Sequence, residues 1–257
     1  MSFPIETLEQ MQGFFWVLIR VSTLFFLLPL FGAKNIPSLW KAGLSFVVAI
    51  VLTPVVPLPA KLPVSAPEII IGVLSEFLMG FILSLTVRMF LSASEMGGHF
   101  MSFQMGFSMA SAVDPQTGAS SNVLTQFLYI LTLLLFFSLN GHHMLIRIIA
   151  KSFYSVPPNS ISFNTAIGNE LIKASASMFV LGVKIAAPIL VALFLSNLCL
   201  GIIARTVPQV NILMVGFPVN LCIGFILFGL ILMNIYPLIF DIKNEIGETL
   251  MRLLGLM

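Results

Sequence analysis

The feature that most limits how this chain can fold is a set of six apolar stretches, each meeting or approaching the length that crosses a lipid bilayer. They cover residues 13–33, 42–59, 69–90, 123–139, 174–204 and 210–240. A helix needs roughly 17–25 mainly apolar residues to span a bilayer, and a chain in lipid must satisfy its own backbone hydrogen bonds. We therefore expect an all-α, membrane-associated fold.

The low content of charged residues supports this interpretation. Only 9% of the residues are charged and 58% are hydrophobic, and the mean hydropathy is +1.07. An average soluble domain has about 25% charged residues. The net charge of +2 is also too small to indicate a surface that binds nucleic acid. A soluble enzyme and a nucleic-acid-binding protein are therefore poor interpretations.

Prolines divide the chain, and two of the stretches are unusually long. Five prolines within residues 54–67 exclude a regular helix there. As helices, stretches 174–204 and 210–240 would each reach about 46 Å, against about 30 Å of hydrocarbon. Their connection is short, so we expect an antiparallel pair of helices. These helices either kink at Pro188 and Pro218 or extend beyond the bilayer.

Single charged or polar side chains lie inside the apolar stretches. Arg20, Glu76 and Lys184 each carry a charge that costs roughly 2.5–3.5 kcal/mol at mid-membrane, so each should face protein or water. Either the three line a proton-coupled site, or they hold contacts between subunits. We favour contacts, because no second carboxylate accompanies Glu76 in its apolar stretch, 69–90. Asn197 and Arg205 lie near the tip of the long pair and are expected to pack at such an interface.

Small residues recur every four positions in the third stretch. Gly72, Gly80 and Ser84 follow this spacing, and Glu76 shares it. Small residues on one face of a helix let another backbone come close. We therefore expect a second helix to pack against this face.

The sequence contains no recognisable catalytic motif. A HExxH helix, a phosphate-binding loop and a GxSxG elbow are all missing from the sequence. His142 and His143 are adjacent, so on a helix they point about 100° apart and cannot chelate one metal ion as an i, i+4 pair would. Cys199 and Cys222 form no paired metal motif. We expect no enzyme activity, no cofactor and no metal site.

Residues 95–122, between the third and fourth stretches, have an unusual composition. They are rich in glycine, methionine and serine and carry few charges. This is too many small residues for a firm helix and too apolar for an ordinary solvated loop. We expect irregular backbone inside the protein, in which Met105, Phe107 and Met109 form a soft apolar seal. A packing loop without a gating role is the alternative.

Three longer motifs carry more specific information. They are QMGFSMASAVDPQTGAS at 104–120, LNGHHMLIRIIAKSF at 139–153 and IARTVPQVNILMVGFPVNLCIGF at 203–225. Together they resemble the FliR family of flagellar type III export-gate proteins, whose virulence-secretion homologues share the architecture. The resemblance covers nearly the whole chain.

The resemblance implies a core subunit of the flagellar export gate, which forms with FliP and FliQ the pore for unfolded export substrates. FlhB and FlhA are further implied partners. A FliP-like portion, 1–173, would precede a FliQ-like helical hairpin, 174–240, and a C-terminal tail, 241–257. The implied location is the bacterial inner membrane, in contact with lipid at the flagellar basal body, with much of the assembly on the periplasmic side.

The resemblance also implies a loop that plugs the pore in the closed state, and it places this loop at residues 104–120. The residues that carry it most clearly are Gln104, Met105, Gly106, Phe107, Met109, Asp114, Pro115, Gln116 and Gly118. A proton-coupled secondary transporter is the alternative function. Such folds usually contain inverted repeats, and the sequence has no convincing pair of matching halves.

Overall fold

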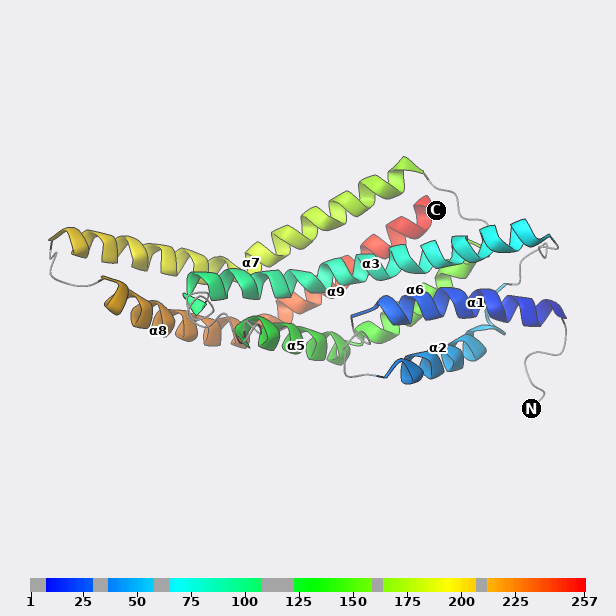
Figure 1. Cartoon of the computed structure of the whole chain (residues 1–257), viewed down its shortest axis with the longest axis horizontal. Helices are drawn as coiled ribbons and strands as arrows, with labels where there is room; N and C mark the ends of the chain where they lie inside the picture. The colour runs from blue at the N-terminus through cyan, green and yellow to red at the C-terminus, as the bar shows by residue number, and fades with distance from the viewer. Residues whose placement is uncertain (1–7, 30–36, 58–64, 108–122, 159–163, 207–211) are drawn as a thin grey trace. The chain divides into compact units, whose positions relative to one another are not determined.

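The structure is a computed structural model that describes residues 8–29, 37–57, 65–107, 123–158, 164–206 and 212–257. Within these ranges the regular elements are all α-helices, and there is no strand (Figure 1). Their bounds are α1 Leu8–Leu27, α2 Ser38–Leu52, α3 Ala66–Gln104, α5 Val123–Ser138, α6 Gly141–Ser155, α7 Thr165–Thr206, α8 Ile212–Met233 and α9 Ile235–Leu256. The all-α fold class expected from the sequence is confirmed.

The helices supply fewer candidate membrane spans than the six apolar stretches indicated. In the described part of the chain, α1, α3, α7 and α8 are long and apolar enough to cross a membrane, judged by length and composition. The pair α5 and α6 adds a fifth if it counts as one broken span. Helix α2 has only 15 residues. It ends at Leu52, with Thr53 as its C-cap, because Pro54 comes two residues after Leu52 and cannot continue a helix.

Helix α3 corrects the expectation that residues 95–122 lack a firm helix, for the part 95–104; residues 108–122 lie outside the described residues. It continues to Gln104, past two adjacent glycines. A Cβ added at Gly97 would lie 3.0 Å from the carbonyl oxygen of Gly182 in α7. A Cβ added at Gly98 would lie 2.8 Å from the Cα atom of Thr125 in α5. Tertiary packing that only glycine permits therefore outweighs the roughly 1 kcal/mol helix cost of each glycine.

The last apolar stretch, 210–240, is also divided differently from the expectation. It forms α8 and the start of α9, and a one-residue break at Asn234 separates them. Pro188 lies inside α7 and Pro218 inside α8, and neither ends its helix. Most of the expected C-terminal tail is helical, because α9 runs to Leu256.

The chain divides into two compact units, and each is built from separate segments. The first unit comprises Met1–Met89, Asn140–Ala174 and Asn244–Met257. The second comprises Phe90–Leu139 and Ser175–Lys243. The resemblance implies a different division, with boundaries after residues 173 and 240. It is based on similarity to FliP and FliQ and not on contacts within this chain, so it stays a prediction.

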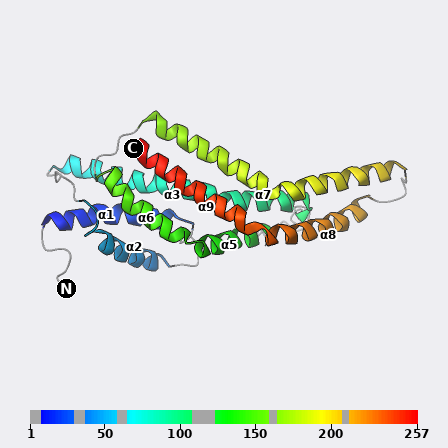
Figure 2. The same cartoon turned by 180° about the vertical axis from the view of Figure 1, so that it is seen from behind.

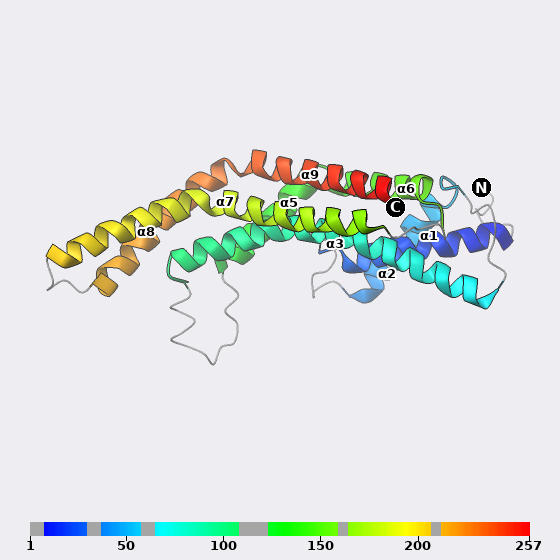
Figure 3. The ribbon, with the colours of Figure 1, turned by 90° about the horizontal axis from the view of Figure 1, so that it is seen from above.

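In the first unit, α1 packs against α2, and the rings of Phe14 and Phe46 meet edge to face with centroids 5.5 Å apart. Ile82, Ile167 and Leu253 form a buried cluster between α3, α7 and α9. Helix α6 lies beside the C-terminal part of α9 in two views (Figures 2 and 3). Helices from early and late in the sequence, such as α3 and α9, therefore pack in this unit through apolar contacts.

In the second unit, α7 and α8 run side by side (Figures 1 and 2). Ser196 of α7 donates a hydrogen bond to Asn220 of α8 at 3.0 Å, and Leu200 faces Gly216. The residue numbers rise along one helix as they fall along the other. The antiparallel pairing expected from the short connection is therefore confirmed.

Candidate functional site

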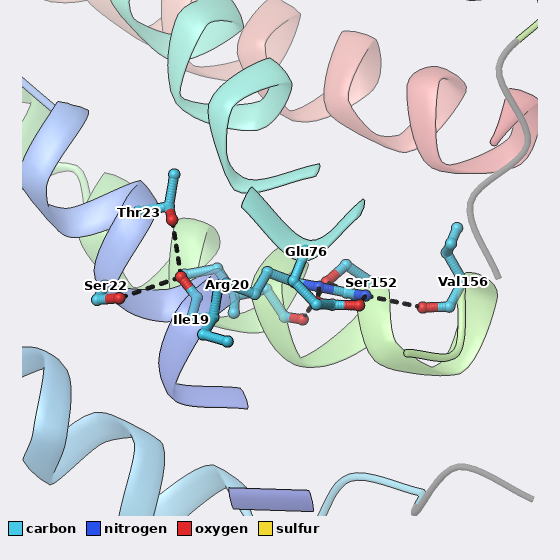
Figure 4. A network of polar contacts seen from close by, with 8 residues as sticks. Ile19, Arg20, Ser22, Thr23, Glu76, Ser152 and Val156 are labelled. Carbon is cyan, nitrogen blue, oxygen red and sulfur yellow. Dashed lines mark hydrogen bonds and ion pairs between the residues drawn. The ribbon is translucent and has the colours of Figure 1, made fainter. Parts of the chain in front are cut away.

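A buried ion pair joins α1 and α3 (Figure 4). Arg20 Nε lies 2.6 Å from Glu76 Oε2, and Arg20 Nη2 lies 2.9 Å from Glu76 Oε1. Both side chains are only 1% exposed. This two-pronged geometry matches the planar guanidinium to the carboxylate and is the strongest form of such a pair.

Arg20 uses its remaining donors on the C-terminal turn of α6. Its Nη1 donates to Ser152 Oγ at 3.0 Å, and its Nη2 also donates to the Val156 carbonyl oxygen at 3.1 Å (Figure 4). The guanidinium carbon lies 4.0 Å from the centroid of the Phe153 ring. A cation is favoured near the carbonyl end of a helix and over an aromatic face. One side chain therefore ties α1 to both α3 and α6.

Close backbone approach makes this arrangement possible. A Cβ added at Gly80, one turn beyond Glu76 in α3, would lie 2.9 Å from the carbonyl oxygen of Arg20 and 2.9 Å from Thr23 Cβ. The expectation that small residues in this stretch admit a second helix is confirmed at Gly80. The helix that packs there is α1 of the same chain.

In the described part of the chain, both side chains of the pair are shielded from solvent. The cavity beside α1 and α3 has a volume of about 290 Å³, and its walls are mostly apolar. The residues that line it are Gln12, Phe15, Trp16, Ile19, Ile69 and Val73. A buried pair that is closed by hydrogen bonds acts chemically as a link between helices, because a solute or a relayed proton needs an open path to it.

The other embedded residues singled out from the sequence lie in α7, in the second unit. Lys184 and Arg205 are exposed. Asn197 accepts a hydrogen bond from Asn220 Nδ2 at 2.7 Å, so it helps to bridge α7 and α8. The assignment of Arg20, Glu76 and these three residues to contacts between subunits stays a prediction.

The described structure includes the first part of the expected plug loop. Gln104 is the last residue of α3, and Met105 is completely buried. Gly106 has a φ of +88°, and Phe107 follows it with partial exposure. The remaining residues assigned to the plug, Met109, Asp114, Pro115, Gln116 and Gly118, lie outside the described residues.

Sequence reasoning identified Arg20 and Glu76 separately and did not pair them. The available signal was one isolated cation and one isolated anion in different apolar helices, a combination that usually pairs. Ser152, Phe153 and Val156 carried no such signal, because their role depends on where α6 ends. The described residues contain no group of three His, Cys, Asp or Glu side chains that could hold a metal ion.

Comparison with known proteins agrees with the sequence motifs. The family described as bacterial export proteins, family 1, matches residues 11–245. The flagellar biosynthetic protein FliR of Bacillus subtilis is 34% identical over 254 residues, covering 97% of each chain. The protein of the same name from Escherichia coli is 30% identical over 95% of this chain and 94% of its own length. The resemblance to the FliR family is confirmed, and the chain belongs to the bacterial export proteins of family 1.

Proposed function

We propose that the chain is a core subunit of the flagellar type III export gate and forms with FliP and FliQ the pore for unfolded export substrates. The observation that carries the proposal is family membership across almost the whole chain. Together with the apolar helices, it supports the coarser statement that the chain is a flagellar export component of the inner membrane. FlhB and FlhA are proposed as further partners.

Uncovered apolar surface is consistent with a role as a subunit. In the candidate span Met214–Met233 of α8, only 22% of the residues are buried, although the mean hydropathy is 2.3. On α7, Phe194 is 58% exposed and Leu198 is 49% exposed. Contiguous apolar surface of this kind marks contact with protein or lipid. We propose that FliP, FliQ and membrane lipid cover this apolar surface.

We assign the closed-state plug to residues 104–120. This assignment rests on the motif shared with the FliR family. The segment connects α3, which ends at Gln104, to α5, which begins at Val123. We propose no catalytic step for the chain, so energy for transport must come from other components.

The geometry gives little support to the alternative of a proton-coupled transporter. Such a mechanism needs Glu76 to exchange protons with a water path or a solute. Both carboxylate oxygens of Glu76 instead accept hydrogen bonds from Arg20, and the side chain is 1% exposed. Lys184, the third proposed member of that site, belongs to the other compact unit.

Co-expression with FliP and FliQ tests the subunit role. We expect native mass spectrometry of the purified material to find this chain in one complex with both proteins. A chain that remains monomeric in their presence would contradict the proposal.

Deletion of residues 105–113 tests the plug. We expect the assembled gate to leak ions more readily, because the segment that closes the pore is shortened. A matched control shortens the connection between α6 and α7 at residues 159–163. An unchanged leak in a gate that still assembles would favour a passive scaffold instead of a plug.

A further inference from the structure

We propose that Met105 and Gly224 form a joint that holds the start of the plug loop against α8. This inference rests on the proposed plug function. Met105 donates its backbone N–H to the Met101 carbonyl oxygen at 2.9 Å, which completes the last turn of α3. Gly106 then takes the left-handed conformation with φ +88°. A left-handed glycine is a common helix terminator, so the chain leaves α3 directly after Met105.

The side chain of Met105 lies on the backbone of α8. It is 0% exposed. A Cβ added at Gly224 would lie 2.6 Å from Met105 Cγ, 2.7 Å from its Cε and 2.9 Å from its Sδ. Real Cβ atoms essentially never make contacts this short, so Met105 keeps this position only with glycine at 224 and must shift if a side chain is added there. An unbranched thioether fits such an irregular space well.

The next two residues also contact α8. A Cβ added at Gly106 would lie 3.0 Å from Cδ2 of Phe217. The ring of Phe107 meets that of Phe225 edge to face, with centroids 6.0 Å apart and planes at 88°. Edge-to-face pairs of this geometry are favourable. Three successive residues therefore contact one helix, and α8 as well as α3 sets the point from which the loop departs.

This arrangement gives α8 a positioning role. A loop whose first residues are already ordered loses less conformational entropy when it occupies a pore. Releasing Met105 from α8 should therefore weaken the plug without removing any plug residue. The joint is distinct from the Arg20–Glu76 pair, which belongs to the other compact unit.

Two alanine substitutions in α8 separate the joint from a general effect on the helix. Gly224→Ala places a methyl group where Met105 lies, whereas Gly229→Ala meets no atom within 4 Å. We expect Gly224→Ala to raise the ion leak of the assembled gate toward that of the 105–113 deletion, and Gly229→Ala to leave it unchanged. Equal leaks in the two variants, beside a leaking deletion, would overturn the joint. A deletion that does not leak would overturn the plug itself.

A reversible cross-link tests the same contact independently of the deletion. Met105→Cys and Gly224→Cys are combined in a chain whose exposed Cys199 and Cys222 are replaced by serine. We expect oxidation to join positions 105 and 224, and to lower the leak relative to the reduced form of the same variant. Met105→Cys with Gly229→Cys should not cross-link. A missing 105–224 cross-link, or a leak that oxidation does not change, would refute the joint.

Discussion

Replacement of Glu76 by methionine should destabilise the chain strongly. Arg20 would remain 1% exposed, with its counter-charge gone. Removing one partner of a buried ion pair typically costs about 3–5 kcal/mol, because the other charge is left uncompensated. We expect Arg20→Met to fall in the same range, because it removes the cation that pairs with the buried Glu76 carboxylate.

The double variant, Arg20→Met with Glu76→Met, should be less damaging than either single change. Replacing a whole buried pair by apolar side chains of similar volume is often close to neutral. One residual cost is the Val156 carbonyl, which loses the Arg20 donor at a cost of about 1–3 kcal/mol. Ser152 keeps a partner, since its hydroxyl also donates to the Ile149 carbonyl oxygen at 2.7 Å. We expect a loss of about 1–3 kcal/mol for the double variant.

The assay compares the free energy of unfolding of the four proteins, purified in detergent. Glu95→Met and Arg88→Met are matched controls, because both side chains are exposed on the same helix α3. Each control should change stability by less than about 0.5 kcal/mol. A double variant that loses the sum of the two single losses would refute the coupling. A fully stable Glu76→Met protein that loses saturable solute transport would instead support the transporter.

Further changes test other contacts. Gly80→Ala should lower the free energy of unfolding by about 1–3 kcal/mol, because the added Cβ meets the backbone of α1. Gly43→Ala is the control, because open space surrounds Gly43, and it should not destabilise the chain. Thermal unfolding compares the two variants. Asn220→Ala removes two hydrogen bonds between α7 and α8, and hydrogen exchange should reveal a loss of about 1–2 kcal/mol in local stability. Arg252→Gln breaks the ion pair in which Arg252 Nε lies 2.6 Å from Glu170 Oε1. Because the Arg252 side chain is 53% exposed, denaturant unfolding should detect a loss of no more than about 1 kcal/mol in the free energy of unfolding, and a smaller loss at high salt.

The fold class could be predicted because hydropathy acts over whole segments. The apolar stretches become helices, and the prolines after residue 53 end α2 as expected, whereas Pro188 and Pro218 lie inside helices. The extension of α3 to Gln104 was missed because glycine lowers helix propensity locally. Close packing of the two glycines on α5 and α7 compensates for this low propensity, and it depends on residues far along the chain.

The candidate site could be predicted only in part, for a similar reason. Arg20 and Glu76 were recognisable because charges are rare in apolar helices. Their pairing spans 56 positions and depends on how α1 and α3 pack, which no local pattern specifies. The contact of Met105 with Gly224 was also not visible, because a methionine near a glycine-rich segment has many possible partners.

The most direct test of the proposed gate is an electron microscopy map of the particle that this chain forms with FliP and FliQ. We expect residues 104–120 to lie on the central axis, in the path of export substrates. A map that places these residues at the outer, lipid-facing rim would contradict the assignment of this chain as the subunit that closes the pore.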